Sequence, residues 1–131
     1  MCYHNRARRL IMYEVEFYYD RNGNSEIVAY LDSLKEKSGT SKTDRINRDK
    51  ILAYMIALGQ HGTRIGQPTV KHIDGSMWEL RPINNRIFFF YWKNNKFILL
   101  HHFVKKTRKT PPSEIEKARS KMKDFIERHG E

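Results

Sequence analysis

The chain has 131 residues, of which 39% are hydrophobic and 12% aromatic, and this predicts one folded globular domain with its own core. The net charge is +10, and most of the excess lies in residues 64–131, which carry 15 Lys/Arg against 7 Asp/Glu. Cys2 is the sole cysteine of the sequence, which excludes an intrachain disulfide and a thiolate metal cluster within one chain. No apolar run approaches the ~20 residues that span a bilayer, so a cytoplasmic protein without membrane contact is expected.

The first clear pattern begins near Met12, where apolar and polar side chains alternate and predict a half-buried strand. Its large side chains on one face are Tyr13, Val15, Phe17 and Tyr19. Residues 1–11 precede this strand and are interpreted as a dispensable N-terminal extension. The single domain is then expected to span residues 12–131.

Two helices are expected next, joined by a short polar connection. Asn24 or Ser25 can cap the first helix, and Gly39 can end it. The second helix is expected over residues 43–58, with Gly59 as its stop. Helices joined by so few residues are expected to form an antiparallel hairpin.

The second half is expected to form short strands separated by turn residues. The expected strands cover residues 70–73, 77–82, 86–92 and 97–105, and the expected turns are Asp74-Gly75, Asn84-Asn85 and residues 93–96. Strands joined by such tight turns pair antiparallel.

The last helix is expected to use Ser113 as its N-cap, with Glu116 three residues later completing a capping box. The order of elements predicts an α+β fold. Its mainly antiparallel sheet is expected to carry the N-terminal helical hairpin and the C-terminal helix on one face.

A few cations interrupt the aromatic and aliphatic runs of residues 77–111, and they are the first candidates for a functional site. They are Arg81, Arg86, Lys105, Lys106, Arg108 and Lys109. Positive charges placed there indicate a surface that holds an anion, and nucleic-acid phosphate is the expected anion for a basic protein. The structural alternatives are an ion pair between Arg81 and Glu79, a hairpin-end charge at Arg86, and a solvated loop for the last four cations.

Two adjacent histidines, His101 and His102, lie within the last expected strand. Because neighbouring residues on a strand point to opposite faces, the pair cannot easily chelate one metal ion, and no metal site is expected. Simple alternation places His101 and Lys105 on one face with Phe97, Leu99 and Phe103, and His102 with Lys106 on the other. Either histidine can be a hydrogen-bonded structural residue or a proton-transfer group, because imidazole titrates near neutrality.

The sequence contains no Gly-rich phosphate loop, no nucleophile elbow and no coherent set of acidic residues for two catalytic metal ions. If the chain is a nuclease, it is therefore expected to work without a metal or cofactor, through attack of the neighbouring 2′-hydroxyl on an RNA phosphodiester. That chemistry needs a proton acceptor, cations that stabilise the pentavalent phosphate, and an acid for the leaving oxygen. A deprotonated lysine or a neutral histidine could act as the acceptor.

Several segments in order resemble the HigB and phage Gp49-like branch of the RelE superfamily of toxins. They are GQHGTRIGQPTVKHIDGSMWELRP, NRIFFFYW and FILLHHFVKKTRKTP, followed by a helical tail. The resemblance implies a small RelE-like domain that is the toxin of a type II toxin–antitoxin pair. It implies a ribosome-dependent mRNA interferase, an endoribonuclease that enters the A site of the 70S ribosome, contacts rRNA and cuts mRNA there. It also implies a HigA-like antitoxin with a helix-turn-helix domain, through which the complex reaches operator DNA.

The same resemblance assigns roles to individual residues. Catalytic roles fall to Arg81, Arg86, His101, Lys105 and Lys106, which belong to the motifs WELR, NRI and LLHHFVKK. RNA-binding roles fall to Lys71, His102, Phe103, Arg108 and Lys109, and Phe103 is available to stack on a base. No obvious carboxylate base is identified in the pocket, which leaves the identity of the base open, and a lysine whose pKa is lowered by neighbouring arginines is one hypothesis.

Two other functions use the same features. A non-catalytic RNA- or DNA-binding module would need the same cations on the same fold, and a structural phage-type protein would act through protein contacts alone. Substitution of Arg86 by Ala separates the enzyme from the binding module. An enzyme would lose cleavage by orders of magnitude, whereas a binding module would lose one phosphate contact and some salt dependence.

Overall fold

The computed structural model describes residues 12–130, and the expected extension at residues 1–11 lies outside them. This part of the chain contains a five-stranded sheet with the order β1-β5-β4-β3-β2. The strands are β1 (Glu14–Phe17), β2 (Val70–Asp74), β3 (Met77–Leu80), β4 (Asn85–Trp92) and β5 (Lys96–Val104). Strands β2 to β5 pair antiparallel in succession, whereas β1 lies parallel to β5. The predicted α+β class with a mainly antiparallel sheet is confirmed.

The two turns that flank β4 place side chains in the left-handed backbone region. Three residues connect β4 to β5, and two of them, Asn94 and Asn95, have φ values of 66° and 58°, a left-handed region that asparagine tolerates. In the turn before β4, Ile83 has a φ of 58°, which a β-branched residue rarely adopts. Asn85 was expected in this turn, but it is the first residue of β4.

The helical hairpin consists of α2 (Glu26–Lys37) and α3 (Lys42–His61), and it is followed by the short 3-10 helix η1 (Gly62–Ile65). Ser25 caps α2, because its hydroxyl accepts a hydrogen bond from the backbone N–H of Val28 at 3.3 Å. Of the two caps that the sequence allowed, Ser25 is therefore the one used.

The prediction that Gly59 ends the second helix is wrong. Gly59 lies inside α3, and Gly62 caps the helix with a φ of 65°. The carbonyl of Gly59 accepts hydrogen bonds from the backbone N–H groups of Met12 and Tyr13, and a Cβ at this position would lie 3.3 Å from the carbonyl oxygen of Tyr13. The missing side chain thus lets the chain leading into β1 lie against α3, and it does not break the helix.

The last helix, α4 (Pro112–His129), begins earlier than predicted. Pro111 is its N-cap and makes no side-chain cap, so Ser113 lies within the first turn and the expected capping box with Glu116 does not form. Proline has a fixed φ that suits the first helical position and no N–H that would need a partner there, so the helix starts at Pro112. No helix between residues 12 and 130 is long and apolar enough to cross a bilayer.

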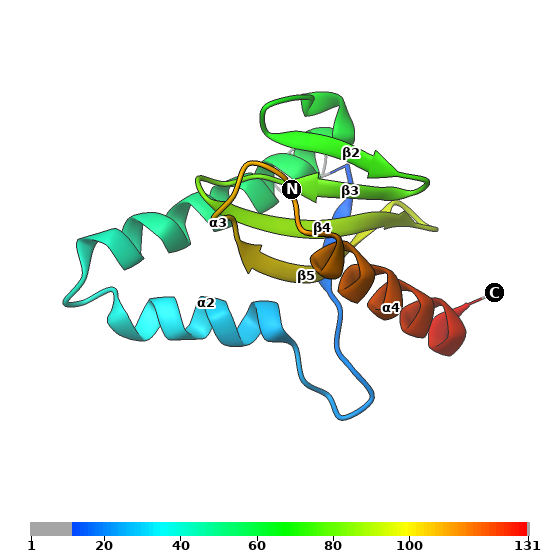
Figure 1. Cartoon of the computed structure of the whole chain (residues 1–131), viewed down its shortest axis with the longest axis horizontal. Helices are drawn as coiled ribbons and strands as arrows, with labels where there is room; N and C mark the ends of the chain where they lie inside the picture. Colours follow the sequence, from blue (N-terminus) through cyan, green and yellow to red (C-terminus); the bar gives the residue numbers. More distant parts are fainter. Residues whose placement is uncertain (1–11, 131) are drawn as a thin grey trace, which may run out of the picture.

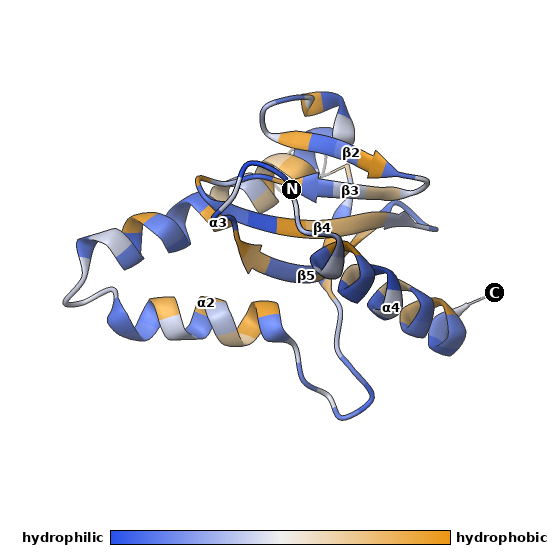
Figure 2. Ribbon diagram, in the orientation of Figure 1, coloured by the Kyte–Doolittle hydropathy of each residue, from blue (hydrophilic) through white to orange (hydrophobic). Residues whose placement is uncertain are grey.

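Helices cover both faces of the sheet, so the expectation of a single covered face is wrong. The hairpin packs Ile27, Leu31, Leu34, Ile51 and Leu58 against one face, whose strands contribute Leu80, Ile87, Phe89 and Leu99. On the opposite face α4 packs Ala118 and Phe125 against Met77, Phe88, Phe90 and Ile98. Figure 1 shows α4 crossing the sheet in front of β4 and β5, and Figure 2 shows the hydrophobic stretches of the strands between the helices. Two covered faces explain why both faces of β4 and β5 are apolar.

A β-bulge in β5 changes which face its last residues occupy. Phe89 pairs with Leu99 but Phe88 pairs with His101, so Leu100 is the extra residue. The bulge brings His101 to the α4 face and His102 to the hairpin face. Phe97 and Leu99 lie on the hairpin face, whereas His101 and Phe103 lie on the α4 face. The predicted shared face of His101 and Phe103 is confirmed, but the prediction that Phe97 and Leu99 share it is wrong.

Candidate functional site

Two arginines come together at one end of the sheet, on the face that α4 covers. Arg86 lies opposite Phe103 of β5, and Arg81 follows the last paired residues of β3 and β4, which places it beside Arg86. Burial, followed by repulsion from Arg81, lowers the pKa of Arg86 below its ordinary value. A guanidinium nevertheless remains charged in proteins, so both cations are present at neutral pH.

Arg86 is held by the turn that precedes β4. The Arg86 side chain is buried, and its Nη1 donates to the carbonyl oxygens of Ile83 at 2.9 Å and Asn85 at 2.8 Å. The Nε atoms of Arg81 and Arg86 are buried without a hydrogen-bond partner among residues 12–130. Nε of Arg81 has only the longer contact with the Glu79 carboxylate at 3.6 Å, so the two guanidiniums are incompletely compensated, which favours an added anion.

The carboxylate of Glu79 lies between Arg81 and the loop that leads to α4. Glu79 is 2% exposed, its Oε1 lies 3.6 Å from Nε of Arg81, and the hydroxyl of Thr110 donates to its Oε2 at 3.3 Å. The ion pair between Arg81 and Glu79, expected as the structural alternative, is present. One carboxylate beside two guanidiniums leaves a local charge of one positive unit, and that charge remains available to a phosphate.

A hollow of about 370 Å³ opens beside Phe103 at the end of β5. Phe103, Lys106 and Glu114 line it, together with Val104, Thr107 and Pro111. Oε1 of Glu114 accepts a hydrogen bond from Nε2 of His101 at 2.6 Å. The site therefore contains an accessible carboxylate supported by a histidine.

His101 is enclosed by charged groups from two helices. It is 4% exposed, and its Nδ1 lies 3.0 Å from Nζ of Lys121, which also bonds Glu26 at 2.6 Å. With Nε2 donating to Glu114, Nδ1 can accept from Lys121, so both ring nitrogens have partners. His101 thus lies next to the hollow but reaches it through Glu114.

His102 lies on the opposite face, under the helical hairpin. Its Nε2 donates to Oδ1 of Asn85 at 2.9 Å, and its ring stacks on Tyr30 with centroids 4.0 Å apart. Burial is the largest cause that lowers the pKa of His102 to about 4, so the ring is neutral at physiological pH. The sheet separates this imidazole from Arg81 and Arg86.

The remaining predicted cations come from β2, from the end of β5 and from the loop that follows it. Lys71 of β2 is exposed and pairs with Glu79, so it lies on the α4 face. The backbone N–H of Lys105 donates to the carbonyl of Asn84 at 2.7 Å, which ties the end of β5 to the turn before β4. Arg108 and Lys109 lie in the exposed loop between β5 and α4.

The structure therefore brings most of the predicted site residues to one face and one end of the sheet. Those on the α4 face or in the hollow are Lys71, Arg81, Arg86, His101, Phe103 and Lys106. Strand parity identified Glu79 as a partner of Arg81, because the two residues share a face. Sequence reasoning missed Glu114, since no pattern in the sequence links it to His101.

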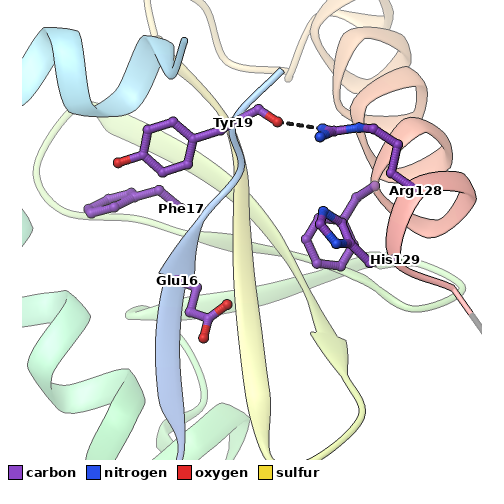
Figure 3. Close-up of a pocket in the computed structure, with 6 residues that line it drawn as sticks. Glu16, Phe17, Tyr19, Arg128 and His129 are labelled. Carbon is purple, nitrogen blue, oxygen red and sulfur yellow. Dashed lines mark hydrogen bonds between the residues drawn. The ribbon is translucent and has the colours of Figure 1, made fainter. Parts of the chain in front are cut away.

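A second hollow, of about 460 Å³, lies between the end of β1 and the C-terminal end of α4 (Figure 3). Figure 3 shows Arg128 donating to the carbonyl of Tyr19 across it. Arg128 also forms an ion pair with Asp124 at 2.8 Å, so its charge is already compensated. This hollow lacks the uncompensated cation found beside Phe103.

The family of this chain follows from its match to a known family of proteins. Residues 29–123 match the family described as Phage derived protein Gp49-like (DUF891), and the match includes both arginines, Glu79 and Glu114. The chain belongs to the Gp49-like family. Gp49-like proteins are part of the RelE/HigB-like toxin superfamily and are related to RelE-type endoribonuclease toxins. No curated protein matches this Gp49-like chain significantly.

Proposed function

We propose that this Gp49-like protein is the toxin of a type II toxin–antitoxin pair and acts as a ribosome-dependent mRNA interferase. The observation that supports this most is the position of Arg81 and Arg86, whose charges Glu79 only partly compensates, next to Phe103. Phe103 and Lys106 line the adjacent hollow. The two guanidiniums, with Glu79 beside them, leave one net positive charge for a phosphate. Phe103 provides an aromatic face for a base, and Lys106 can carry a proton.

In the proposed reaction the RNA 2′-hydroxyl attacks the adjacent phosphorus, and the bond to the 5′-oxygen of the next nucleotide breaks. The products are a 2′,3′-cyclic phosphate and a free 5′-hydroxyl. Negative charge accumulates on the non-bridging oxygens as the phosphorane forms, and Arg86 with Arg81 lies where fixed positive charge would stabilise it. Lys71, Lys105, Arg108 and Lys109 extend the positive surface along the RNA backbone and rRNA.

Proton transfer is assigned to side chains that line the hollow. Lys106 and Glu114 both line it, and Glu114 is oriented by His101 at 2.6 Å. Of the two histidines in the motif, His101 acts through Glu114 and His102 faces away. We therefore propose Glu114 or Lys106 as the acceptor of the 2′-hydroxyl proton, with the other as the donor to the leaving oxygen.

The proposed partner is a HigA-like antitoxin with a helix-turn-helix domain, which would connect the complex to operator DNA. A protein with a net charge of +10 favours a partner with acidic surface. The proposed target, translating ribosomes, places the activity in the cytoplasm. Titration with a candidate antitoxin should give a stable complex at physiological salt, and failure to form one would exclude that pairing.

The proposal is tested by adding the protein to a reconstituted translation reaction and mapping new 5′ ends on a defined mRNA, with and without ribosomes. Cuts within A-site codons that require ribosomes are expected. Cuts on free RNA would remove the ribosome from the mechanism, and the absence of cuts in both reactions would favour the binding-module alternative.

Arg86→Ala distinguishes an enzyme from a non-catalytic binder. We expect cleavage to fall by on the order of 10² or more, because one oxyanion-type donor typically contributes this much. Arg45→Ala is the matched control, since it removes the same charge from an exposed position on α3. Equal, small effects of both substitutions would contradict a catalytic role for Arg86. Thermal unfolding of each variant verifies that the loss does not reflect misfolding.

A further inference from the structure

Asn85 is buried on the hairpin face, and its side-chain amide has no unused hydrogen-bonding capacity. Its Nδ2 donates to Oδ1 of Asn47 at 2.7 Å and to the carbonyl of Pro82 at 3.1 Å. Its Oδ1 accepts from the hydroxyl of Tyr30 at 3.1 Å and from Nε2 of His102 at 2.9 Å. Two donors and two acceptor positions are all that an amide offers, so Asn85 has nothing left with which to bind a ligand.

The partners of Asn85 come from three different elements. Tyr30 belongs to α2, Asn47 to α3 and His102 to β5, and Asn47 also donates to the hydroxyl of Tyr30 at 3.2 Å. We call Tyr30, Asn47, Asn85 and His102 the hairpin network. Fully satisfied polar networks in a protein interior are rigid, and each member holds the others in place.

The hairpin network adjoins the arginine pair through the backbone. Asn85 directs its side chain to the hairpin face and its carbonyl to Nη1 of Arg86, which lies on the α4 face. The same Nη1 bonds the carbonyl of Ile83, whose left-handed backbone is unfavourable for a β-branched residue. The segment from Pro82 to Arg86 is thus held on the hairpin face by the side-chain amide of Asn85 and on the α4 face by the guanidinium of Arg86.

We propose that Asn85 is a positioning residue that holds Arg86 in the pose needed to bind the scissile phosphate, and that the helical hairpin sets this pose through the hairpin network. This inference rests on the proposed function for its consequence in catalysis. A displacement of either hairpin helix changes the contacts of Asn85 and is transmitted to Arg86 across the sheet. The hairpin would therefore influence Arg86 through contacts within the protein.

Tyr30→Phe is the test, because it removes one hydroxyl from the hairpin network and leaves the ring that stacks on His102. Tyr13→Phe is the matched control, since Tyr13 is also half-buried against the same core but lies outside the hairpin network. In the ribosome-dependent cleavage assay we expect Tyr30→Phe to lower cleavage at saturating ribosomes by on the order of 10-fold while KM changes little, because small misplacements of a catalytic group act on kcat. The control should retain wild-type rates.

A second measurement does not require catalysis. Nitrogen-15 relaxation of the Arg86 Nε–H group reports how rigidly the guanidinium is held, and Tyr30→Phe should increase its motion whereas Tyr13→Phe should not. If the wild-type protein cleaves no RNA, the proposed function fails, and this measurement still tests the positioning.

An unchanged Arg86 signal and an unchanged kcat in Tyr30→Phe would overturn the inference. Equal changes in both Tyr variants would also overturn it, because they would reflect a general loss of stability. If Tyr30→Phe does not fold, Asn47→Ala replaces it, because Asn47 is a half-buried member of the hairpin network. The cleavage kcat and the relaxation of the Arg86 Nε–H group are measured again, and the same results support or overturn the inference.

Discussion

Replacement of Glu79 by glutamine is expected to change stability and RNA affinity in opposite directions. Glu79 is the carboxylate that compensates part of the charge of Arg81 and Arg86, and it is nearly inaccessible at 2% exposure. Glu79→Gln keeps the shape and an oxygen that can accept from Thr110, but it removes the negative charge. The folded protein then holds two close guanidiniums without their counter-ion, while a phosphate meets a site that is more positive by one unit.

The size of the stability loss follows from the geometry of the ion pair. At 3.6 Å between Nε of Arg81 and Oε1 of Glu79, the attraction is roughly 4–5 kcal/mol at an effective dielectric constant of about 20. The side chain of Arg81 is 21% exposed, so water restores part of its hydration when the carboxylate is lost. We therefore expect a loss of about 2 kcal/mol in the free energy of unfolding, below the ~3–5 kcal/mol that breaking a fully buried pair costs.

Urea unfolding gives the stability change, and fluorescence anisotropy with a short single-stranded RNA over a series of salt concentrations gives the affinity. Glu79→Gln should bind RNA more tightly at low salt, and its salt slope should steepen by up to ~0.7 if one more phosphate is neutralised. Glu36→Gln on the exposed surface of α2 is the charge-matched control and should change neither quantity appreciably. Unchanged stability together with equal or weaker RNA binding would refute the assignment of Glu79 as the counter-ion of the site.

Three further predictions concern proton transfer, pH and the backbone. Glu114→Gln should lower cleavage by roughly 10²–10⁴, whereas Glu116→Gln on the exposed side of the same helix should not, and equal rates in cleavage assays would exclude Glu114 as a proton carrier. Because burial holds the pKa of His102 at about 4 instead of 6.5, protons bind preferentially to the unfolded chain between these values, so stability should fall as pH drops through this window. His102→Gln should flatten that part of the curve in unfolding experiments at several pH values, and an unaltered curve would contradict the buried neutral ring. Gly62→Ala should destabilise the fold by ~1–3 kcal/mol, because Gly62 has a φ of 65° and a new Cβ would lie 2.7 Å from the ring of Tyr13, whereas Gly39→Ala has open space and should melt near the wild-type temperature.

The periodicity of the sequence was sufficient to predict the strands, the helical hairpin and the last helix, because these depend on local alternation and turn residues. Periodicity was insufficient to predict which face of the sheet each helix covers. A chain with apolar residues on both faces of β4 and β5 gives no sign of which helix covers which face, and the position of α4 depends on contacts such as Phe125 with Trp92. The bulge at Leu100 is likewise set by the fit between β4 and β5 and has no sequence signal of its own.

In the candidate site too, features set by nearby residues were predictable, whereas contacts between residues far apart in the sequence were not. Arg81 and Arg86 could be singled out because cations within strands are unusual, and their proximity follows from the tight β3–β4 turn. The contact between His101 and Glu114 needed the bulge and the early start of α4 at once, and each of these features departs from the prediction. The long-range partner of His101 was therefore less predictable than the candidate cations Arg81 and Arg86.

The parallel pairing of β1 with β5 has a consequence for synthesis of the chain. Glu14, near the start of the described residues, has its strand partner at Lys96, so β1 emerges from the ribosome long before it can join the sheet. At ~5–20 residues per second, roughly 4–16 s separate the two events. Arg86 and Phe103 also come together only when β5 pairs with β4, so the cation site and the closed sheet mature in the same late step. In the nascent chain, Arg86 and Phe103 therefore cannot pair until β5, which ends at Val104, has been synthesised.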